Sequence, residues 1–144
     1  MGKPKATTAK ERLLANHVVG DHTEVVDLQM DALTNWQTIV KYAEEADVVF
    51  NLIDVGEYFD VAVQSLCMKK KKLLLQGGTF CQQLNVDMFK PGQPCVVCSF
   101  CPKQTDVIDR IKPSVIESVE NLEFLPRDRN PVGQTNVYVC AICS

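Results

Sequence analysis

Hydrophobic residues near the N-terminus recur with helical spacing. In the stretch 6–16, Ala6, Ala9, Leu13 and Leu14 gather along one side of a helix, while the charged residues lie largely elsewhere. This pattern predicts a helix on the surface of the protein.

The next segments predict a strand followed by a helix. Residues 24–28, Glu-Val-Val-Asp-Leu, are a candidate short strand. Thr34 and Gln37 have the spacing of a capping box, which predicts that a helix begins here. The apolar residues of this helix are Trp36, Ile39, Val40 and Ala43.

The middle of the chain contains its most continuous apolar run. Residues 48–53 are apolar at nearly every position, as expected for a central strand that is covered on both faces of a parallel sheet. Residues 57–72 then have helical spacing, and the run ends in lysines 69–72, which we interpret as a solvated helix end. The predicted buried side of this helix consists of Phe59, Val63, Leu66 and Cys67.

Short extended segments follow this helix. Residues 73–75 predict a buried strand, 76–79 (Gln-Gly-Gly-Thr) a turn, and 80–86 another extended piece. Strands separated by helices need crossover connections, so we predict an α/β fold with a doubly wound, mostly parallel sheet. Such a fold normally begins with a strand and a Gly-rich phosphate loop, and the sequence contains no Gly-x-Gly-x-x-Gly. We therefore expect a sheet that is incomplete at its N-terminal, nucleotide-loop side, with the first strand and turn on another polypeptide, cut away or never present.

Composition narrows the class of protein. With 144 residues, 46% of them hydrophobic, the chain can bury one core, which predicts a single (partial) domain over residues 1–144. The net charge of -3 and the pI near 5.3 lack the basic excess of a nucleic-acid binder. No apolar run approaches the roughly 20 residues that cross a bilayer, and no signal core follows the start, so we expect neither membrane insertion nor secretion. An odd count of seven cysteines fits a reducing, cytoplasmic location.

Two Cys-x-x-Cys pairs carry the clearest chemistry. Cys95 with Cys98 and Cys140 with Cys143 supply the four thiolates that a tetrahedral zinc site needs. The long interval between the pairs is typical of a bridging staple rather than of a compact finger. We therefore predict one structural zinc ion, with residues 90–144 as the zinc-cysteine region.

The other cysteines and the histidines have plainer interpretations. Cys101 continues the first pair at the same spacing and either replaces one ligand or stays a free thiol. A redox dithiol is the competing chemistry, but one pair is flanked by prolines and the other lies at the end of the chain, unlike a thioredoxin-like site. Cys67 and Cys81 lie among apolar residues and are predicted to be buried small hydrophobes. His17 and His22 are predicted to be exposed rather than metal ligands.

Several segments, taken in order, resemble one family. They are Gly-Lys-Pro-Lys-Ala at 2–6 before a helix, the strand-like run 47–54, the pair Gly77-Gly78, Pro-Cys-Val-Val-Cys at 94–98, and the terminal Cys-x-x-Cys. In this order they resemble the E1-like adenylyltransferases, the family that includes MoeB, ThiF and the ubiquitin-activating enzymes. The resemblance spans most of the chain and covers only the later part of the family's domain.

The resemblance implies an activity and two site residues. Members of this family use Mg-ATP to adenylate the C-terminal carboxylate of a ubiquitin-like or sulfur-carrier protein, and many carry a four-cysteine structural zinc. By this resemblance Lys5 contacts the ATP phosphates, and Asp54 is the catalytic aspartate that organises magnesium and the nucleotide. The position agrees with physical expectation, because open parallel sheets bind ligands outside the carboxyl ends of their strands.

Departures from the family pattern leave two functions open. The family usually follows its aspartate with an asparagine and, a little further on, an arginine, whereas this chain has Val-Gly-Glu-Tyr-Phe at 55–59. Asn51 stands where the family has an earlier aspartate. The chain is either part of an ATP-dependent adenylyltransferase, completed by missing residues or a partner, or a non-catalytic zinc-binding interaction module. In both cases an incomplete sheet predicts a homo-oligomer or a complementing chain. Without the resemblance, Asp54 is equally a cap of the following helix, and Lys5 is an ordinary exposed lysine.

Overall fold

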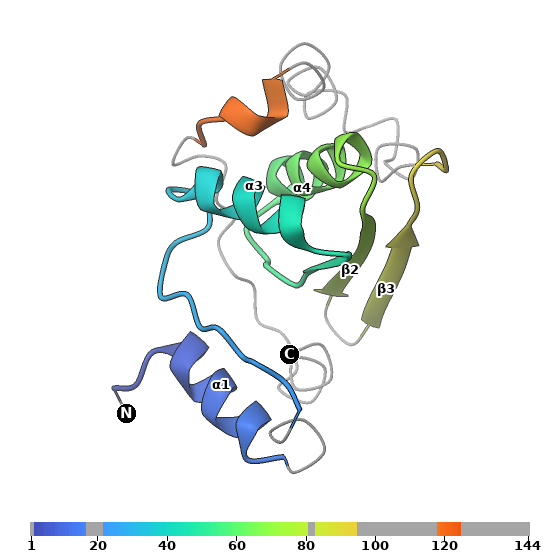
Figure 1. Ribbon diagram of the computed structural model, residues 1–144. Coiled ribbons are helices and arrows are strands. Elements are labelled where there is room, and N and C mark those ends of the chain that lie inside the picture. The colour runs from blue at the N-terminus through green and yellow to red at the C-terminus, as the bar shows by residue number, and fades with distance from the viewer. Residues whose placement is uncertain (1, 17–21, 81–82, 95–117, 125–144) are drawn as a thin grey trace. The chain divides into compact units, whose positions relative to one another are not determined.

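The computed structural model describes residues 2–16, 22–80, 83–94 and 118–124 (Figure 1). The chain divides into two compact units, Met1–Thr34 and Asn35–Ser144. The described residues have an α/β fold with three α-helices, one short 3-10 helix and a three-stranded mixed sheet. None of the helices in these segments is long and apolar enough to cross a membrane.

The first unit contains helix α1, Lys5–Leu14, followed by an extended segment. None of the residues of α1 is buried within the described structure, which confirms the predicted surface helix. The extended segment is attached to α1 by polar side chains, because Asp27 accepts hydrogen bonds from Thr7 at 2.9 Å and from Lys10 at 3.3 Å. The strand predicted at 24–28 was wrong, since its contacts with α1 come from side chains and the segment joins no sheet ladder.

The second unit begins with helix α3, Trp36–Glu45. The helix was predicted correctly, but the capping box was wrong. The N-cap residue is Asn35, and no side chain caps it. Thr34 instead donates its hydroxyl to the carbonyl oxygen of Asp31 at 3.3 Å, and Gln37 donates its side-chain amide to the carbonyl oxygen of Glu120 at 2.6 Å. Thr34 therefore bonds locally to the turn before the helix, and Gln37 makes a long-range contact with residue Glu120 instead of a capping bond.

A parallel crossover forms the centre of this unit. Strand β1, Val48–Asn51, is followed by helix α4, Glu57–Lys69, and by strand β2, Leu73–Phe80. β1 and β2 pair in parallel, with Val49 opposite Leu74 and Asn51 opposite Gln76. Strand β3, Gln83–Phe89, pairs with β2 in the antiparallel direction. The order of the described strands is β1-β2-β3, so β2 rather than β1 is the middle strand.

The third strand corrects two predictions. Residues 76–79 were expected to form a turn, yet they lie inside β2. Only two residues separate β2 from β3, which allows a hairpin, whereas a parallel pair needs a crossover of a dozen or more residues. The described sheet is therefore mixed, and it does not bear out the mostly parallel expectation. The side chain of Leu52 packs closely against Gly77, because a Cβ at position 77 would lie only 2.7 Å from Cδ2 of Leu52.

The core lies between one face of the sheet and the helices α3, α4 and η1, the last a 3-10 turn at Val119–Asn121 (Figure 1). All four residues predicted on the buried side of α4 are buried. An aromatic group fills the space between α3 and α4, where the Trp36 ring meets Phe59 edge-on at 5.8 Å and Phe124 at 5.2 Å. The other buried apolar residues of this core are Val40, Ala43, Val61, Ala62, Leu74, Val119 and Leu122.

The opposite face of the sheet is apolar and exposed within the described residues. Phe50 is 65% exposed, and Val86 and Met88 are 66% and 54% exposed. The register puts these side chains on one face, because Phe50 pairs with Leu75, Leu75 with Met88, and Gly77 with Val86. The continuous apolar run predicts that residues 48–53 are covered on both faces of the sheet. In the described part of the chain, only one face is covered.

Candidate functional site

The loop from β1 to α4 carries the predicted catalytic aspartate. β1 ends at Asn51, Asp54 follows in the loop, and α4 begins at Glu57. The Asp54 side chain is exposed. Because β1 and β2 are parallel and α4 connects them, Asp54 lies outside the carboxyl end of a parallel strand. Open sheets bind their ligands at this position.

The start of α4 depends on Gly56. This residue is the N-cap and has a φ of 126°, a conformation that residues with side chains rarely adopt. Its carbonyl oxygen accepts hydrogen bonds from the backbone N–H groups of Phe59 at 3.1 Å and Asp60 at 3.3 Å. The alternative in which Asp54 caps this helix was therefore wrong, and its carboxylate is left exposed in the loop.

A hydrogen bond between Asn51 and Asp60 lies beneath this loop. The Asn51 side chain is 3% exposed, and its Nδ2 donates to Oδ1 of Asp60 at 2.8 Å. Its Oδ1 accepts a longer hydrogen bond of 3.4 Å from the backbone N–H of Ile53. The side chain of one buried residue thus joins the first turn of α4 to the backbone just before Asp54.

The carboxyl group of Asp60 is unusually hard to ionise. Its pKa is raised from 3.8 to about 6, mainly by burial, with the negative charges of Asp54 and Glu57 contributing to the rise. The hydrogen bond from Asn51 acts in the opposite direction, because it stabilises the charged form. The charged form of Asp60 is therefore stabilised mainly by the side-chain amide of Asn51.

Asp60 is not among the site residues predicted from the sequence. A signal was present, since Asp60 is a single carboxyl within an apolar stretch that runs from Phe59 to Val63. Asp60 also directly follows Phe59, one of the residues predicted on the buried side of this helix. What the sequence lacks is any sign that Asn51, nine positions earlier, supplies the donor.

Lys5 is the other residue that the family resemblance singles out. It is the first residue of α1 and is exposed. Lys5 belongs to the first unit and Asp54 to the second. A shared site for the two remains a prediction.

The predicted zinc ligands Cys95, Cys98, Cys140 and Cys143 lie outside the described residues, as do Cys81, Cys101 and His17. Among the residues that are described, no group of three or more His, Cys, Asp or Glu is arranged to hold a metal ion. His22 is exposed, as expected. Cys67 is buried, and burial raises the pKa of its thiol to about 11, which confirms its interpretation as a small hydrophobe.

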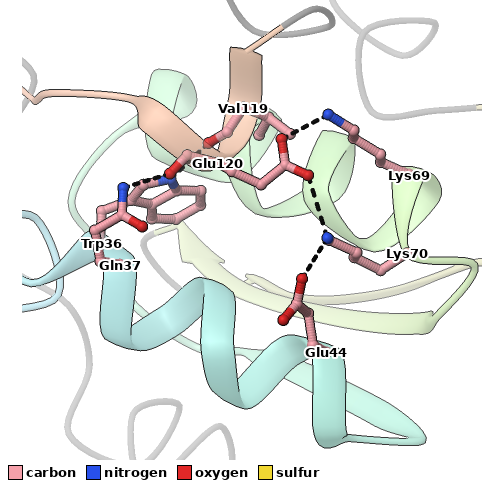
Figure 2. Close-up of polar contacts among 7 residues, drawn as sticks. All are labelled: Trp36, Gln37, Glu44, Lys69, Lys70, Val119 and Glu120. Carbon is pink, nitrogen blue, oxygen red and sulfur yellow. Dashed lines mark hydrogen bonds and ion pairs between the residues drawn. The ribbon is translucent and has the colours of Figure 1, made fainter.

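Lys69 and Lys70 at the end of α4 make specific ion pairs, which the interpretation of the lysine run as a solvated helix end did not include, although Lys69 and Lys71 are exposed as expected. Figure 2 shows Lys69 and Lys70 reaching Glu120 of η1, at 2.5 Å and 3.2 Å. Lys70 also pairs with Glu44 at the end of α3. These lysines lower the pKa of Glu120 to about 2, mainly through the hydrogen bond from Lys69. The contact joins residues about fifty positions apart, so local spacing holds no signal for it.

No protein-family model matches the chain, and a search of curated proteins finds no match.

Proposed function

We propose that the chain is the later part of a cytoplasmic, ATP-dependent adenylyltransferase domain of the E1-like kind. It activates the C-terminal carboxylate of a ubiquitin-like or sulfur-carrier protein. The observation that carries this proposal is the position of Asp54, exposed outside the carboxyl end of β1 at the start of a parallel crossover. The finer fold belongs to the same proposal: a doubly wound sheet completed on its nucleotide-loop side from elsewhere, with the four-cysteine zinc staple in residues 90–144.

The chemistry explains why one exposed carboxylate is sufficient here. In adenylation a carboxylate oxygen of the carrier attacks the α-phosphorus of ATP, and pyrophosphate leaves. Magnesium at such sites is bound by one or two carboxylates together with phosphate oxygens and water, so Asp54 needs no cluster of protein ligands around it. Lys5, by the family resemblance, supplies positive charge to the phosphates.

The test is ATP-pyrophosphate exchange in the presence of ubiquitin-like carriers. The isolated chain should show no exchange, because it lacks the Gly-rich loop whose N–H groups offset the phosphate charge. Exchange should appear when the domain is completed by an extension or a partner chain, and Asp54→Ala should abolish it.

Asp47→Ala is the matched control for this experiment. Asp47 is an exposed carboxylate just before the amino end of the same strand, so its removal should leave exchange unchanged. Robust exchange by the isolated chain would contradict the incomplete-domain proposal. A completed protein that is active but indifferent to Asp54→Ala would remove the role given to Asp54.

One observation favours the second candidate function, a non-catalytic zinc-binding interaction module with a degenerate adenylyltransferase fold. The sheet face that carries Phe50, Val86 and Met88 is apolar and exposed within the described residues, which is typical of a surface that contacts another protein. A completed protein that binds a carrier or partner subunit, yet shows no exchange, would favour the module over the enzyme.

A further inference from the structure

We propose that Asp60 is a positioning residue that acts through the Asn51 amide. It fixes the backbone of residues 52–54, and so the direction in which the chain runs from the end of β1 to Asp54. The consequence for activity rests on the proposed function of Asp54. The positioning itself rests only on the contacts among Asp60, Asn51 and Ile53.

The two ends of the Asn51 amide have different chemistry, and this gives the contact its direction. The NH2 group can only donate, and the carbonyl oxygen can only accept. Asp60 is ionised at neutral pH and can only accept, so it orients Nδ2 toward α4 at 2.8 Å. The Oδ1 atom is then turned toward the N–H group of Ile53, at 3.4 Å. A side-chain oxygen bound to the backbone two residues further on is a local turn, and here it shapes the residues that lead to Asp54.

The identity of residue 51 therefore depends on the identity of residue 60. An aspartate at position 51 would set a second carboxylate against Asp60, and two such groups at this distance either repel each other or share one proton, with one pKa strongly raised. In either case the hydrogen bond from amide to carboxylate is lost. Exchanging the two residues restores the chemistry. The amide, now at position 60, would donate, and the carboxylate, now at position 51, would accept both from that amide and from the Ile53 N–H. The double exchange separates positioning from simple loss of a side chain.

The position of Asp60 makes its charge costly, which supports a role beyond packing. It is partly buried, it lies near the like charges of Asp54 and Glu57, and the side-chain contact that stabilises its charge is the one with Asn51. A neutral side chain at position 60 would fit the same place without that cost. The carboxylate, however, holds the Asn51 amide more strongly than a neutral acceptor would.

The first experiment measures hydrogen exchange of the Ile53 amide by NMR in the full chain at pH 7.5. Asp60→Ala and Asn51→Asp should each speed exchange at Ile53 by about fivefold, the ratio given by one hydrogen bond of typical net strength. The Leu74 amide in β2 reports on the rest of the fold and should change much less. The double variant Asn51→Asp with Asp60→Asn should return Ile53 to the wild-type rate.

Asp47→Asn, before the amino end of β1, is the control and should leave Ile53 exchange unchanged. Unchanged exchange at Ile53 in Asp60→Ala would overturn the positioning role. If a single variant fails to fold, the double exchange decides: a folded double variant with wild-type Ile53 exchange supports the proposal, and one with fast exchange or no fold overturns it.

The second experiment follows ATP-pyrophosphate exchange in the completed protein with the same variants. We expect kcat to fall in Asn51→Asp and to recover in the double exchange, while KM for ATP changes less. If the wild type shows no exchange while Ile53 responds as expected, the proposed function fails and the positioning stands. If Asp54→Ala abolishes exchange but Asn51→Asp does not alter kcat, the proposed function stands and the link from Asp60 to activity is overturned.

Discussion

The indole Nε1 of Trp36 donates a 2.6 Å hydrogen bond to the backbone carbonyl oxygen of Val119, which lies 83 positions further along the chain (Figure 2). Both residues are buried, so neither group has water as an alternative partner. The bond joins the first residue of α3 to η1 at the place where the aromatic rings of Phe59 and Phe124 meet the indole. The η1 segment is thus attached to the core by a buried polar contact as well as by ion pairs.

Trp36→Phe should destabilise the protein by about 2 kcal/mol, because the Val119 oxygen loses its donor and the smaller ring leaves part of the site unfilled. Urea unfolding followed by circular dichroism measures this loss, since the only tryptophan of the chain is removed by the substitution. Tyr42→Phe, on the exposed side of the same helix, should change the free energy of unfolding by less than about 0.5 kcal/mol. Equal stability of the two variants would show that the hydrogen bond contributes nothing.

Asp60→Asn should make the protein more stable at neutral pH. The pKa of Asp60 rises from 3.8 to about 6 on folding, so between these values the folded chain keeps a proton that the unfolded chain has released. Lowering the pH through this window therefore favours the folded state, and raising it above 6 removes that gain. We expect Asp60→Asn to raise the free energy of unfolding at pH 7.5 by about 2 kcal/mol.

The same variant should lose the rise in stability that the wild type shows as the pH falls from about 7 to about 4.5. Urea unfolding at several pH values measures both effects. Glu120 acts mainly at lower pH: its pKa is lowered from 4.5 to about 2, so its contribution is present above 4.5 and is lost as the pH falls toward 2. A wild-type protein whose stability is flat across the first of these windows would contradict the role of Asp60.

The purified chain should hold about one zinc ion per molecule, because four thiolates complete a tetrahedral shell. Cys98→Ser or Cys140→Ser should destabilise the protein far more than Cys67→Ala, since metal binding energy is coupled to folding. Metal analysis after gel filtration and thermal unfolding with and without a chelator measure these effects. The zinc prediction fails if the protein carries no zinc, or if exhaustive chelation leaves its stability unchanged.

The chain should associate with itself or with a partner through the exposed sheet face. Light scattering at micromolar concentration should show species larger than a monomer, and Val86→Lys should shift the population toward the monomer because it puts a charge on that face. Val26→Lys is the control, at an exposed valine in the first unit. A monodisperse wild-type monomer would show that this face is covered within the chain.

The sequence by itself determined the elements whose signal is local. Helical periodicity was enough to predict α1 and α4, and the apolar run at 48–53 was enough to predict β1. The buried side of α4, with Phe59 and Leu66, followed from the same spacing. These predictions succeeded because the contacts of a helix face or a strand depend on residues only a few positions apart.

Only the tertiary structure decided the partners of individual residues. It placed Gly77 and Gly78 inside β2, where sequence reasoning predicted a turn, because they pair with Val86 and Asn85 of the strand that follows. It also brought Asn51 into a hydrogen bond with Asp60, and Lys70 into ion pairs with both Glu44 and Glu120. The physical reason is that a hydrogen-bond donor has many possible acceptors in a sequence, and the path of the folded chain selects the one that comes within about 3 Å.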